Sequence, residues 1–330
     1  MQMKRPFELL VAGEINPDLI LSGDVVPAFR QVEKLVDSAV LVAGSSAVIT
    51  ASAGVRLGLR TAFIGVRGND LFGDFMVGEM KRLGLDVTGV IVDPALPTGL
   101  TVILDRTADT SSREGKNTAD ARNFPPGDRA MLTLTGAMSA LNAGDIGDDL
   151  LRQARHLHVA SFFLQKALQP GLPDLFQRAH RCGLTTSLDT NWDPANLWVG
   201  MQEVLPLCDV LFLNENEAKA ISGADGVEAA GWKLAESCGM VAIKQGAQGA
   251  SVFRRKETSS FPAPVVNVVD TVGAGDTFNG GFLYGFLKGW SMEKSLQLGV
   301  ICGSLSTRTA GGTSAQPTLD EALQHARPVG

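Results

Sequence analysis

Two aspartates bracket a loop of small residues in the last quarter of this 330-residue chain. The run reads "DTVGAGDTFNGGF", with Asp270 at its start and Asp276 at the second acidic position. Between them lie Gly273, Ala274 and Gly275, and glycines let backbone N–H groups turn inward and approach a ligand closely. The loop therefore predicts a cradle of amides for an anion.

An aromatic helix is expected directly after this loop. Phe278, Phe282 and Phe286 recur every four residues, which predicts one buried face of a helix. The first N–H groups of a helix are unpaired and carry partial positive charge, so a helix start beside a glycine loop suits a phosphate group. The β-branched run "APVVNVVD" at 263–270 predicts a strand, which would place the loop at a strand-to-helix junction.

Asp276 opens the predicted helix, where a carboxylate is commonly a cap. A carboxylate beside a phosphate site also repels the ligand, so we expect it to have a second role. That role would be to accept the proton of an attacking hydroxyl, as the catalytic aspartate of kinases does. Asp270 is expected to organise the loop or to bind a cation.

The elements that must position this loop can be read from alternating patterns. Short apolar runs predict strands at "FELLVAG", "ARHLHVAS", "GLTTSLDTN", "CDVLFLNENE" and "GMVAIKQG", with helical stretches such as "LPDLFQRAHRCG" between them. This alternation predicts an α/β fold with a mostly parallel central sheet and helices on both faces. Ligands of such sheets bind beyond the carboxyl ends of the strands. We expect one domain over 1–330, with a small β-sheet lid contributed by about 18–42 and 98–124.

Composition excludes several other classes. The net charge is −6 and no dense Lys/Arg run occurs, so a nucleic-acid partner is not expected. No stretch approaches the ~20 apolar residues of a membrane helix, and the N-terminal apolar run is too short for a signal peptide. The four cysteines are far apart and form no CxxC pair, which indicates buried thiols in a reducing cytoplasm.

The chain resembles the ribokinase-like (PfkB) carbohydrate kinases. "DTVGAGDTFNGGF" is similar to the C-terminal signature of that family, and "VAGEINPDLIL", "AGSSAVI", "LDTNWDP" and "LFLNENEAKAISG" match it in order and spacing over almost the whole chain. The resemblance implies a three-layer α/β/α domain with a small β lid. It also implies ATP- and Mg²⁺-dependent phosphorylation of a hydroxymethyl oxygen on a small sugar or sugar acid, with Asp276 as base and the 273–275 amides as the anion hole.

The resemblance also implies a sugar site near the N-terminus. Asn16 and Asp18 are two apart, so in a strand they would share one face and could hold vicinal hydroxyls; an Asn-Pro turn is the alternative. Gly44 and Ser45 are expected to contact the substrate; they lie in "AGSSAVI", where the family's usual glycine pair is here Ala43 and Gly44. Val48 stands where the family usually has an asparagine that contacts the sugar, which would remove one hydroxyl partner.

The nucleotide side is expected to involve the "NENE" motif. Asn214 and Glu217 are three apart, as in the family's NxxE motif, where Glu217 would reach Mg²⁺ through water. From the residues alone a helix capping box is equally favoured. Further nucleotide contacts implied by the resemblance are Lys244, Gly246, Gly249, Thr271 and the 306–318 loop. Asp270 and Val272 would hold a monovalent cation such as K⁺. Lys244 could equally be a solvated lysine at a turn.

Several other interpretations were weighed. A nucleoside kinase of the same family and a non-catalytic ligand-responsive protein remain alternatives. A dehydrogenase would need GxGxxG after its first strand, where "VAGEINPD" has one glycine. Arg106 and Arg113 in the lid could pair with an acidic acceptor or lie exposed. His156 and His158 share a strand face without a third ligand, so no metal site is expected there. The exposed lid edge predicts a homodimer.

Overall fold

An eight-stranded sheet forms the middle of the molecule, whose computed structural model describes residues 5–106 and 129–326. Its order is β14-β13-β12-β11-β10-β9-β1-β4. The six strands β4, β1, β9, β10, β11 and β12 run parallel to one another. β13 pairs antiparallel with β12, and β14 pairs antiparallel with β13. The bounds are β1 Leu9–Ala12, β4 Thr61–Ile64, β9 His156–Val159, β10 Thr185–Asp189, β11 Val210–Asn214, β12 Val241–Lys244, β13 Ala250–Arg254 and β14 Glu257–Phe261.

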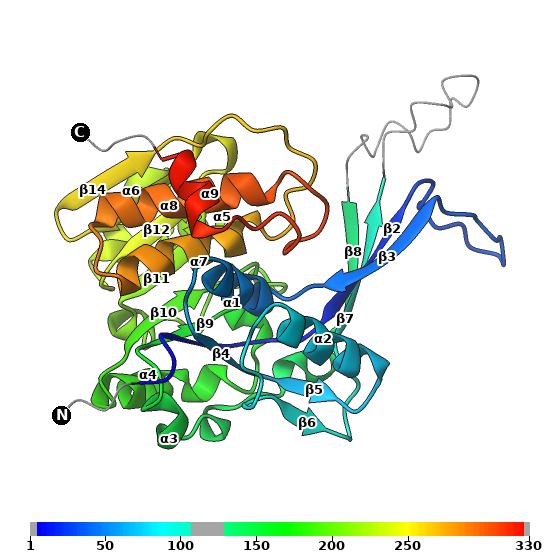
Figure 1. Cartoon of the computed structure of the whole chain (residues 1–330), viewed down its shortest axis with the longest axis horizontal. Helices are drawn as coiled ribbons and strands as arrows, with labels where there is room; N and C mark the ends of the chain where they lie inside the picture. The colour runs from blue at the N-terminus through cyan, green and yellow to red at the C-terminus, as the bar shows by residue number, and fades with distance from the viewer. Residues whose placement is uncertain (1–4, 107–128, 327–330) are drawn as a thin grey trace.

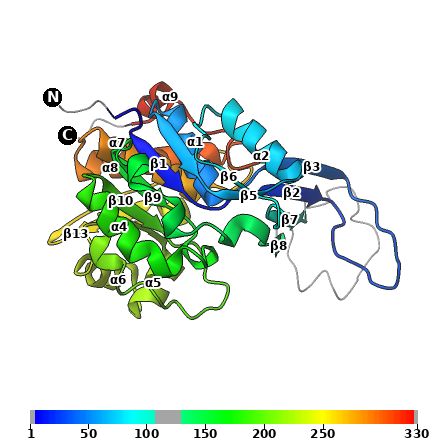
Figure 2. The same cartoon turned by 90° about the horizontal axis from the view of Figure 1, so that it is seen from below.

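Helices cover both faces of this sheet, because its strands are apolar on both sides. In β1, Leu9 and Val11 enter one hydrophobic core while Leu10 and Ala12 enter the other. Figure 2 shows α1 (Ser46–Arg56), α7 (Ala274–Leu287), α8 (Met292–Ser306) and α9 (Leu319–Gln324) on one side of the sheet. On the other side lie α4 (Leu172–Arg181), α5 (Glu215–Ser222) and α6 (Val227–Ala235). The three-layer α/β/α arrangement is therefore confirmed.

A second, four-stranded sheet projects from the main body (Figure 1). Its order is β3-β2-β7-β8, with β2 at Pro17–Ser22, β3 at Ser38–Ala43, β7 at Leu100–Asp105 and β8 at Arg129–Leu134. β7 lies within the ranges expected for a lid, β2 and β3 overlap them to within one residue, and β8 falls beyond 124. The rest of the second range, with Arg113, lies outside the described residues.

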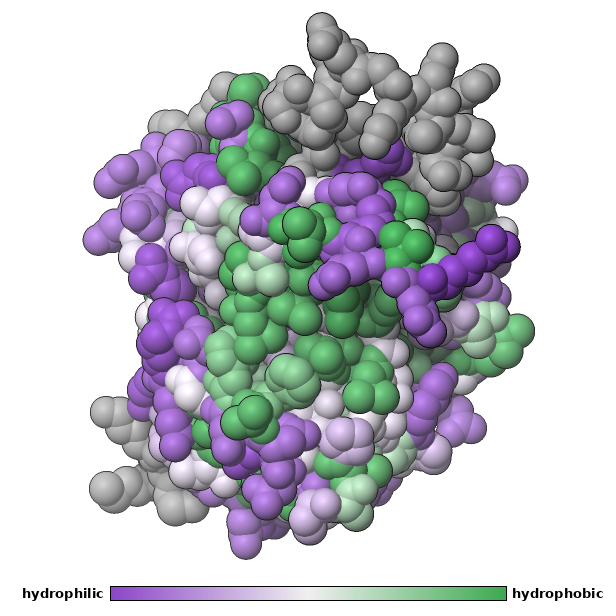
Figure 3. Space-filling view, turned by 90° about the vertical axis from the view of Figure 1, so that its right-hand side faces the viewer, coloured by the Kyte–Doolittle hydropathy of each residue, from purple (hydrophilic) through white to green (hydrophobic). Residues whose placement is uncertain are grey.

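The lid side carries apolar residues at its surface. Val40, Met131, Leu132 and Leu134 on β3 and β8 are exposed. In Figure 3, which views the molecule from the side where the lid projects, hydrophobic residues gather in the middle of the face with hydrophilic ones around them. The remaining elements are the paired short strands β5 (Val66–Gly68) and β6 (Ile91–Asp93), and the helices α2 (Leu71–Arg82) and α3 (Asp148–Leu151).

One strand prediction was wrong. After β14 ends at Phe261, the segment 262–270 has no strand structure. Pro262 and Pro264 lack N–H donors, which prevents a regular ladder. Val265, Val268 and Val269 are exposed instead of packing in a core. The loop that precedes α7 is thus an irregular connection from the sheet edge.

The other sequence expectations can be compared directly. His156 and His158 are fully buried and both share the Ser187 hydroxyl, at 2.7 and 2.8 Å from their ring nitrogens. In residues 5–106 and 129–326 no three metal-ligating side chains gather, and no helix is long and apolar enough to span a membrane. All four cysteines are free thiols.

Candidate active site

The polar residues of the site lie at the carboxyl ends of the parallel strands. Because β1, β9, β10, β11 and β12 are successive parallel strands of one sheet, their carboxyl ends lie along one edge, as the sequence indicated. Asp189 ends β10, Asn214 ends β11 and Lys244 ends β12, with Asn214 and Lys244 directly paired in register. Residues remote in sequence are thereby placed side by side.

The anion loop stands at this edge and begins α7. Gly273 has φ +71°, and a Cβ there would lie 2.8 Å from the Gly312 Cα, so the position requires glycine. The Ala274 amide donates to Thr271 O at 3.2 Å, so it is already engaged in a turn. Fourteen residues of α7 follow, and the dipole of this helix points its positive end at the loop. The predicted cradle at a helix start is present, although its predicted strand is not.

Asp276 lies in the first turn of α7 and remains partly exposed. Burial raises the pKa of its carboxyl to about 7, and the negative charge of Asp189 adds to the rise. Lys244 opposes that shift, and a hydrogen bond from Ser46 does the same. A carboxyl with a pKa near neutrality can take up a proton and release it again at working pH.

Lys244 is held in a buried ion pair. Its Nζ lies 2.8 Å from Asp189 Oδ2, and the side chain is only 14 % exposed. Asn279 on α7 also donates to Asp189 Oδ2. Burial works against an ionised Asp189, but Lys244 and these hydrogen bonds outweigh it and lower the pKa of that carboxyl. The alternative of a solvated lysine is therefore wrong; a phosphate contact stays a prediction.

Lys244 also lies against the anion loop. A Cβ on Gly275 would be 3.3 Å from Lys244 Nζ, so the ammonium group is adjacent to the loop backbone. The charges of Glu217 and Asp276 also act on Lys244. Lys244 thus forms an ion pair with Asp189 and also interacts electrostatically with Glu217 and Asp276.

Asn214 and Glu217 form a capping box, one of the two interpretations that the residues alone left equally favoured. Asn214 Oδ1 accepts from the Asn216 and Glu217 amides, while Glu217 Oε2 accepts from Asn214 N at 2.8 Å. Glu217 Oε1 accepts from Asn214 Nδ2 at 2.7 Å. Burial raises the pKa of Glu217 to about 7, with Asp189 contributing. With both oxygens hydrogen-bonded in the chain, Glu217 suits contact with a metal through water.

Asp270 is the centre of a second network. Its Oδ1 accepts from Val272 N at 2.9 Å and from Arg129 Nη1 at 2.7 Å, and its Oδ2 accepts from Gly311 N at 3.0 Å. Burial opposes ionisation, but the two amides and the guanidinium lower the pKa of Asp270. Arg129 begins lid strand β8, so this carboxylate ties the lid to the anion loop.

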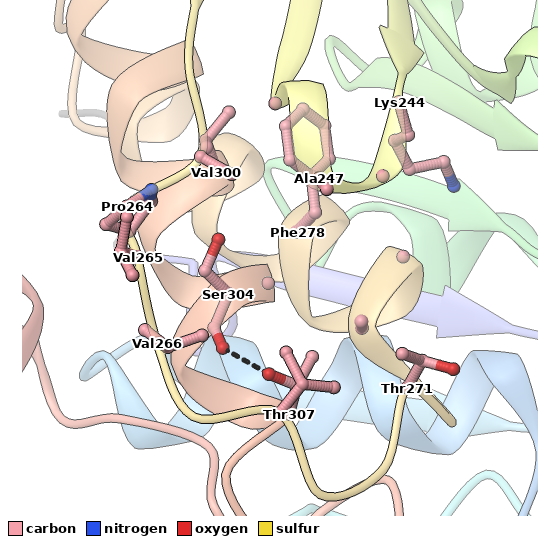
Figure 4. A pocket seen from close by; sticks show the side chains of 17 residues that line it. Lys244, Ala247, Pro264, Val265, Val266, Thr271, Phe278, Val300, Ser304 and Thr307 are labelled. Atoms are coloured by element: carbon pink, nitrogen blue, oxygen red, sulfur yellow. Dashed lines mark hydrogen bonds between the residues drawn. The ribbon is translucent and has the colours of Figure 1, made fainter.

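A pocket of about 700 Å³ leads to the anion loop. Figure 4 shows Pro264, Val265 and Val300 on one side and Lys244 and Thr271 on the other. Two of the exposed valines in segment 262–270, Val265 and Val268, therefore line a pocket. Among the predicted nucleotide contacts, this lining includes Lys244, Gly246, Gly249 and Thr271, and it also includes Ala274 and Gly275 of the predicted anion hole. An apolar half suits a base, and the half near α7 suits phosphates.

The predicted sugar residues gather where β2 and α1 begin. β2 begins at Pro17, so Asn16 precedes the strand, yet its Nδ2 donates to Asp18 Oδ1 at 3.2 Å. Gly44 lies against Asp18, since a Cβ on it would be 2.3 Å from Asp18 Oδ1. Ser45 is the N-cap of α1, and Val48 is fully buried in the core.

Sequence reasoning missed three polar residues of the site. Asp189 and Asn279 lie within quoted motifs but were assigned no role, and their partner Lys244 lies 55 and 35 residues away along the chain. Glu14 follows β1 and is 2 % exposed. A single acidic residue after an apolar run was the signal for Glu14.

The comparisons with known proteins agree with this geometry. The model of the pfkB family carbohydrate kinases matches residues 7–319. The chain belongs to this family. It is 28 % identical to a 5-dehydro-2-deoxygluconokinase of Geobacillus thermodenitrificans over 99 % of this chain and 96 % of that one. It is 27 % identical to the ribokinase of Haemophilus influenzae over 96 % and 97 % of the two chains.

A solved structure gives the same fold. An E. coli protein assigned as a ribokinase II, in complex with ATP and Mg²⁺, has a TM-score of 0.80 at 22 % identity and covers 96 % of this chain and 98 % of its own. This pfkB-family chain therefore has the ribokinase-like fold. It is a phosphotransferase with an alcohol group as acceptor.

Proposed function

We propose that the chain transfers the γ-phosphoryl group of ATP to a hydroxymethyl oxygen of a small sugar-like molecule, with Asp276 as the base. The single observation that carries this proposal is the place of Asp276. It stands in the first turn of α7 beside Gly275, which lines the pocket, and its carboxyl interacts with Ser46 at the start of α1 and with the charge of Glu14. A carboxylate at this point can face an acceptor hydroxyl while the loop amides face a phosphate.

The reaction assigns a task to each group. Asp276 takes the proton from the acceptor hydroxyl as its oxygen forms a bond to the γ-phosphorus and the bond to the ADP oxygen breaks. The loop amides at 273 and 275 and the ammonium of Lys244 face the negative charge of the phosphoryl group. Asn16 and Asp18 orient the acceptor hydroxyls, and the lid sheet limits access of water.

Mg²⁺ fits the residues that are present. Such an ion keeps several waters and binds mainly through substrate phosphates, and Glu217 is placed for contact through one of those waters. When bound, the ion neutralises charge on the phosphates. The 306–318 loop would border the adenine. K⁺ at Asp270 and Val272 stays a prediction, and Arg129 already supplies a positive charge there.

An acceptor panel tests the proposal. ADP release and ³¹P spectra of the product would be measured with ribose, fructose, 2-dehydro-3-deoxygluconate and adenosine. We expect a sugar phosphoester, and we expect its formation to be lost in Asp276→Asn while ATP still binds. Retained turnover in that variant would refute the base assignment. Preference for adenosine would favour the nucleoside kinase alternative, and a lack of ATP consumption with every acceptor would favour a non-catalytic role.

Two further expectations belong to this proposal. We expect a homodimer through the lid, because apolar side chains of β8 such as Met131 and Leu132 are exposed. Sedimentation of the chain and of a Met131→Asp variant would test it, and a monomer at all concentrations would contradict it. Free thiols and the use of ATP favour the cytoplasm.

A further inference from the structure

A buried carboxylate that has no part in the reaction above lies next to the acceptor residues. Glu14 directly follows the strand β1 and Gly13, at the same sheet edge as Asp189 and Lys244. Its side chain is held near the start of α1, because the Ala47 amide donates to Glu14 Oε1 at 3.3 Å. Ser45 Oγ fixes the same segment by donating to the Glu14 carbonyl at 2.7 Å.

The other carboxylate oxygen has no hydrogen-bond partner. Glu14 Oε2 is buried without a donor, and so is Asn16 Oδ1, two residues further along. Glu14 and Asn16 are 2 % and 4 % exposed. Buried acceptors in a folded protein are nearly always satisfied, so a pair of unsatisfied acceptors in one place indicates a ligand that brings donors.

Glu14 also interacts electrostatically with other carboxyls of the site. Its charge raises the pKa of Asp18 and that of Asp276. Among residues 5–106 and 129–326, the ion pairs include none to Glu14 or Asp18. The cation that acts on Asp276 is Lys244, and Asp189 holds it at 2.8 Å. The described ion pairs therefore leave Glu14 and Asp18 without a partner cation, and each of these carboxyls that ionises makes the acceptor region more negative.

We propose that Glu14 selects the acceptor by charge, so that this kinase takes neutral polyhydroxylated or amine-bearing sugars and disfavours sugar acids. The inference rests on the proposed function and narrows its acceptor class. A hydroxyl group both donates and accepts, so it satisfies Glu14 whether that carboxyl is ionised or protonated. An ammonium group adds attraction to all three carboxyls. A carboxylate group in the same place offers no donor to Glu14 or Asn16, and it is repelled by Asp18 and Asp276 whenever these are ionised.

The size of the effect follows from Coulomb's law. One like charge at about 6 Å, in a protein environment with an effective dielectric constant of about 20, changes binding by roughly 100-fold, and salt and partial exposure reduce this figure. We therefore expect removal of the Glu14 charge to change the discrimination by roughly 10-fold or more.

The test uses three acceptors that differ only at C1. Fructose carries CH₂OH there, 2-keto-gluconate carries a carboxylate and 1-amino-1-deoxyfructose carries CH₂NH₃⁺. The ratios of kcat/KM would be measured with Mg²⁺-ATP for the unaltered chain and for Glu14→Gln. We expect kcat/KM for the amine and for the alcohol to exceed kcat/KM for the acid by roughly 10-fold or more. In Glu14→Gln the ratio of alcohol to acid should fall by a similar factor.

A matched control is Glu8→Gln. Glu8 is also a partly enclosed carboxylate next to β1, but it lies before the strand and pairs with Lys288 at 2.7 Å. Its loss should leave the ratio among the three acceptors unchanged. Thermal unfolding of both variants checks that each is folded.

The outcomes separate the two proposals. Phosphorylation of the acid in preference to the alcohol, or a ratio unmoved by Glu14→Gln, overturns the role of Glu14 and leaves the kinase assignment standing. If none of the three sugars, nor any member of the wider acceptor panel, accepts phosphate, the proposed function falls and takes this inference with it.

Discussion

Asp276 should make the protein less stable as pH rises, and Asp276→Asn should remove that loss. The pKa of this carboxyl is raised from its ordinary value of 3.8 to about 7, mainly by burial and then by Asp189. A raised pKa in the folded state means that the folded protein binds the proton more tightly than the unfolded chain. The stability contribution of this group is thus fully present below pH 3.8 and is lost as pH rises through about 7.

The magnitude follows from the shift. A rise from 3.8 to about 7 corresponds to about 4 kcal/mol, as an upper limit because Asp276 is partly exposed and interacts with other carboxyls. Most of this change, about 2.5 kcal/mol, falls between about pH 5 and pH 8. Asparagine has a similar shape and does not titrate. The stability of the variant relative to the unaltered chain should therefore increase by up to about 2.5 kcal/mol between pH 5 and pH 8.

Urea unfolding of both chains at pH 5, 6, 7 and 8 would measure the free energy of unfolding. Turnover, measured in parallel, should fall by roughly 10²–10⁴-fold in the variant. We therefore expect Asp276→Asn to be nearly inactive and, at pH 8, to be more stable relative to the unaltered chain than it is at pH 5. A difference in stability that stays constant with pH would show that Asp276 has an ordinary pKa in the folded protein, and the electrostatic account of the site would be wrong.

Three more substitutions test other parts of the site. Lys244→Met leaves Asp189 buried without its cation, so the free energy of unfolding should fall by about 3–5 kcal/mol in urea titrations; a neutral result would deny the ion pair. Glu217→Gln keeps the helix cap but removes the charge, so the Mg²⁺ concentration for half-maximal rate should rise severalfold; no change would remove Glu217 from the metal's surroundings. Gly273→Ala should cost about 1–3 kcal/mol and most of the rate, since φ is +71° and Gly312 is 2.8 Å from the added Cβ; wild-type kinetics would show that the loop can move.

Much of the sheet could be predicted because its strands are apolar on both faces. β1, β9, β11 and β12 are short apolar runs in the sequence. Because predicted helices alternate with them, the three-layer arrangement could be predicted as well. β14 has the sequence "ETSSF" and was not predicted. This edge strand is mostly polar, so it shows no apolar run, and no helix separates it from β13. The segment 262–270 shows the opposite error. It has the composition of a strand, but Val265, Val266 and Val268 line a pocket. Composition does not distinguish valines that pack in a core from valines that face a ligand.

The site could be predicted only where one short stretch contains it. The loop 273–275 and Asp276 are contiguous with their helix, so local rules suffice. The Asp189–Lys244 pair depends on β10 and β12 ending on either side of β11, and only the strand order shows that. Lys244 had two interpretations because the nearest sequence neighbours contain no carboxylate to hold it.

The groups that make this site reactive also work against the stability of the ligand-free protein. Glu14, Asp18, Glu217 and Asp276 all have raised pKa values, chiefly through burial, with repulsion between carboxyls adding to it for the last three. Packing alone does not call for such a group, since apolar residues would fill the same space without repulsion. Donors from an acceptor sugar would relieve Glu14 and Asp18, while proton transfer from that sugar neutralises Asp276. Repulsion in the free protein is therefore turned into affinity for hydroxyl-bearing ligands and into basicity at the carboxylate that must take the proton.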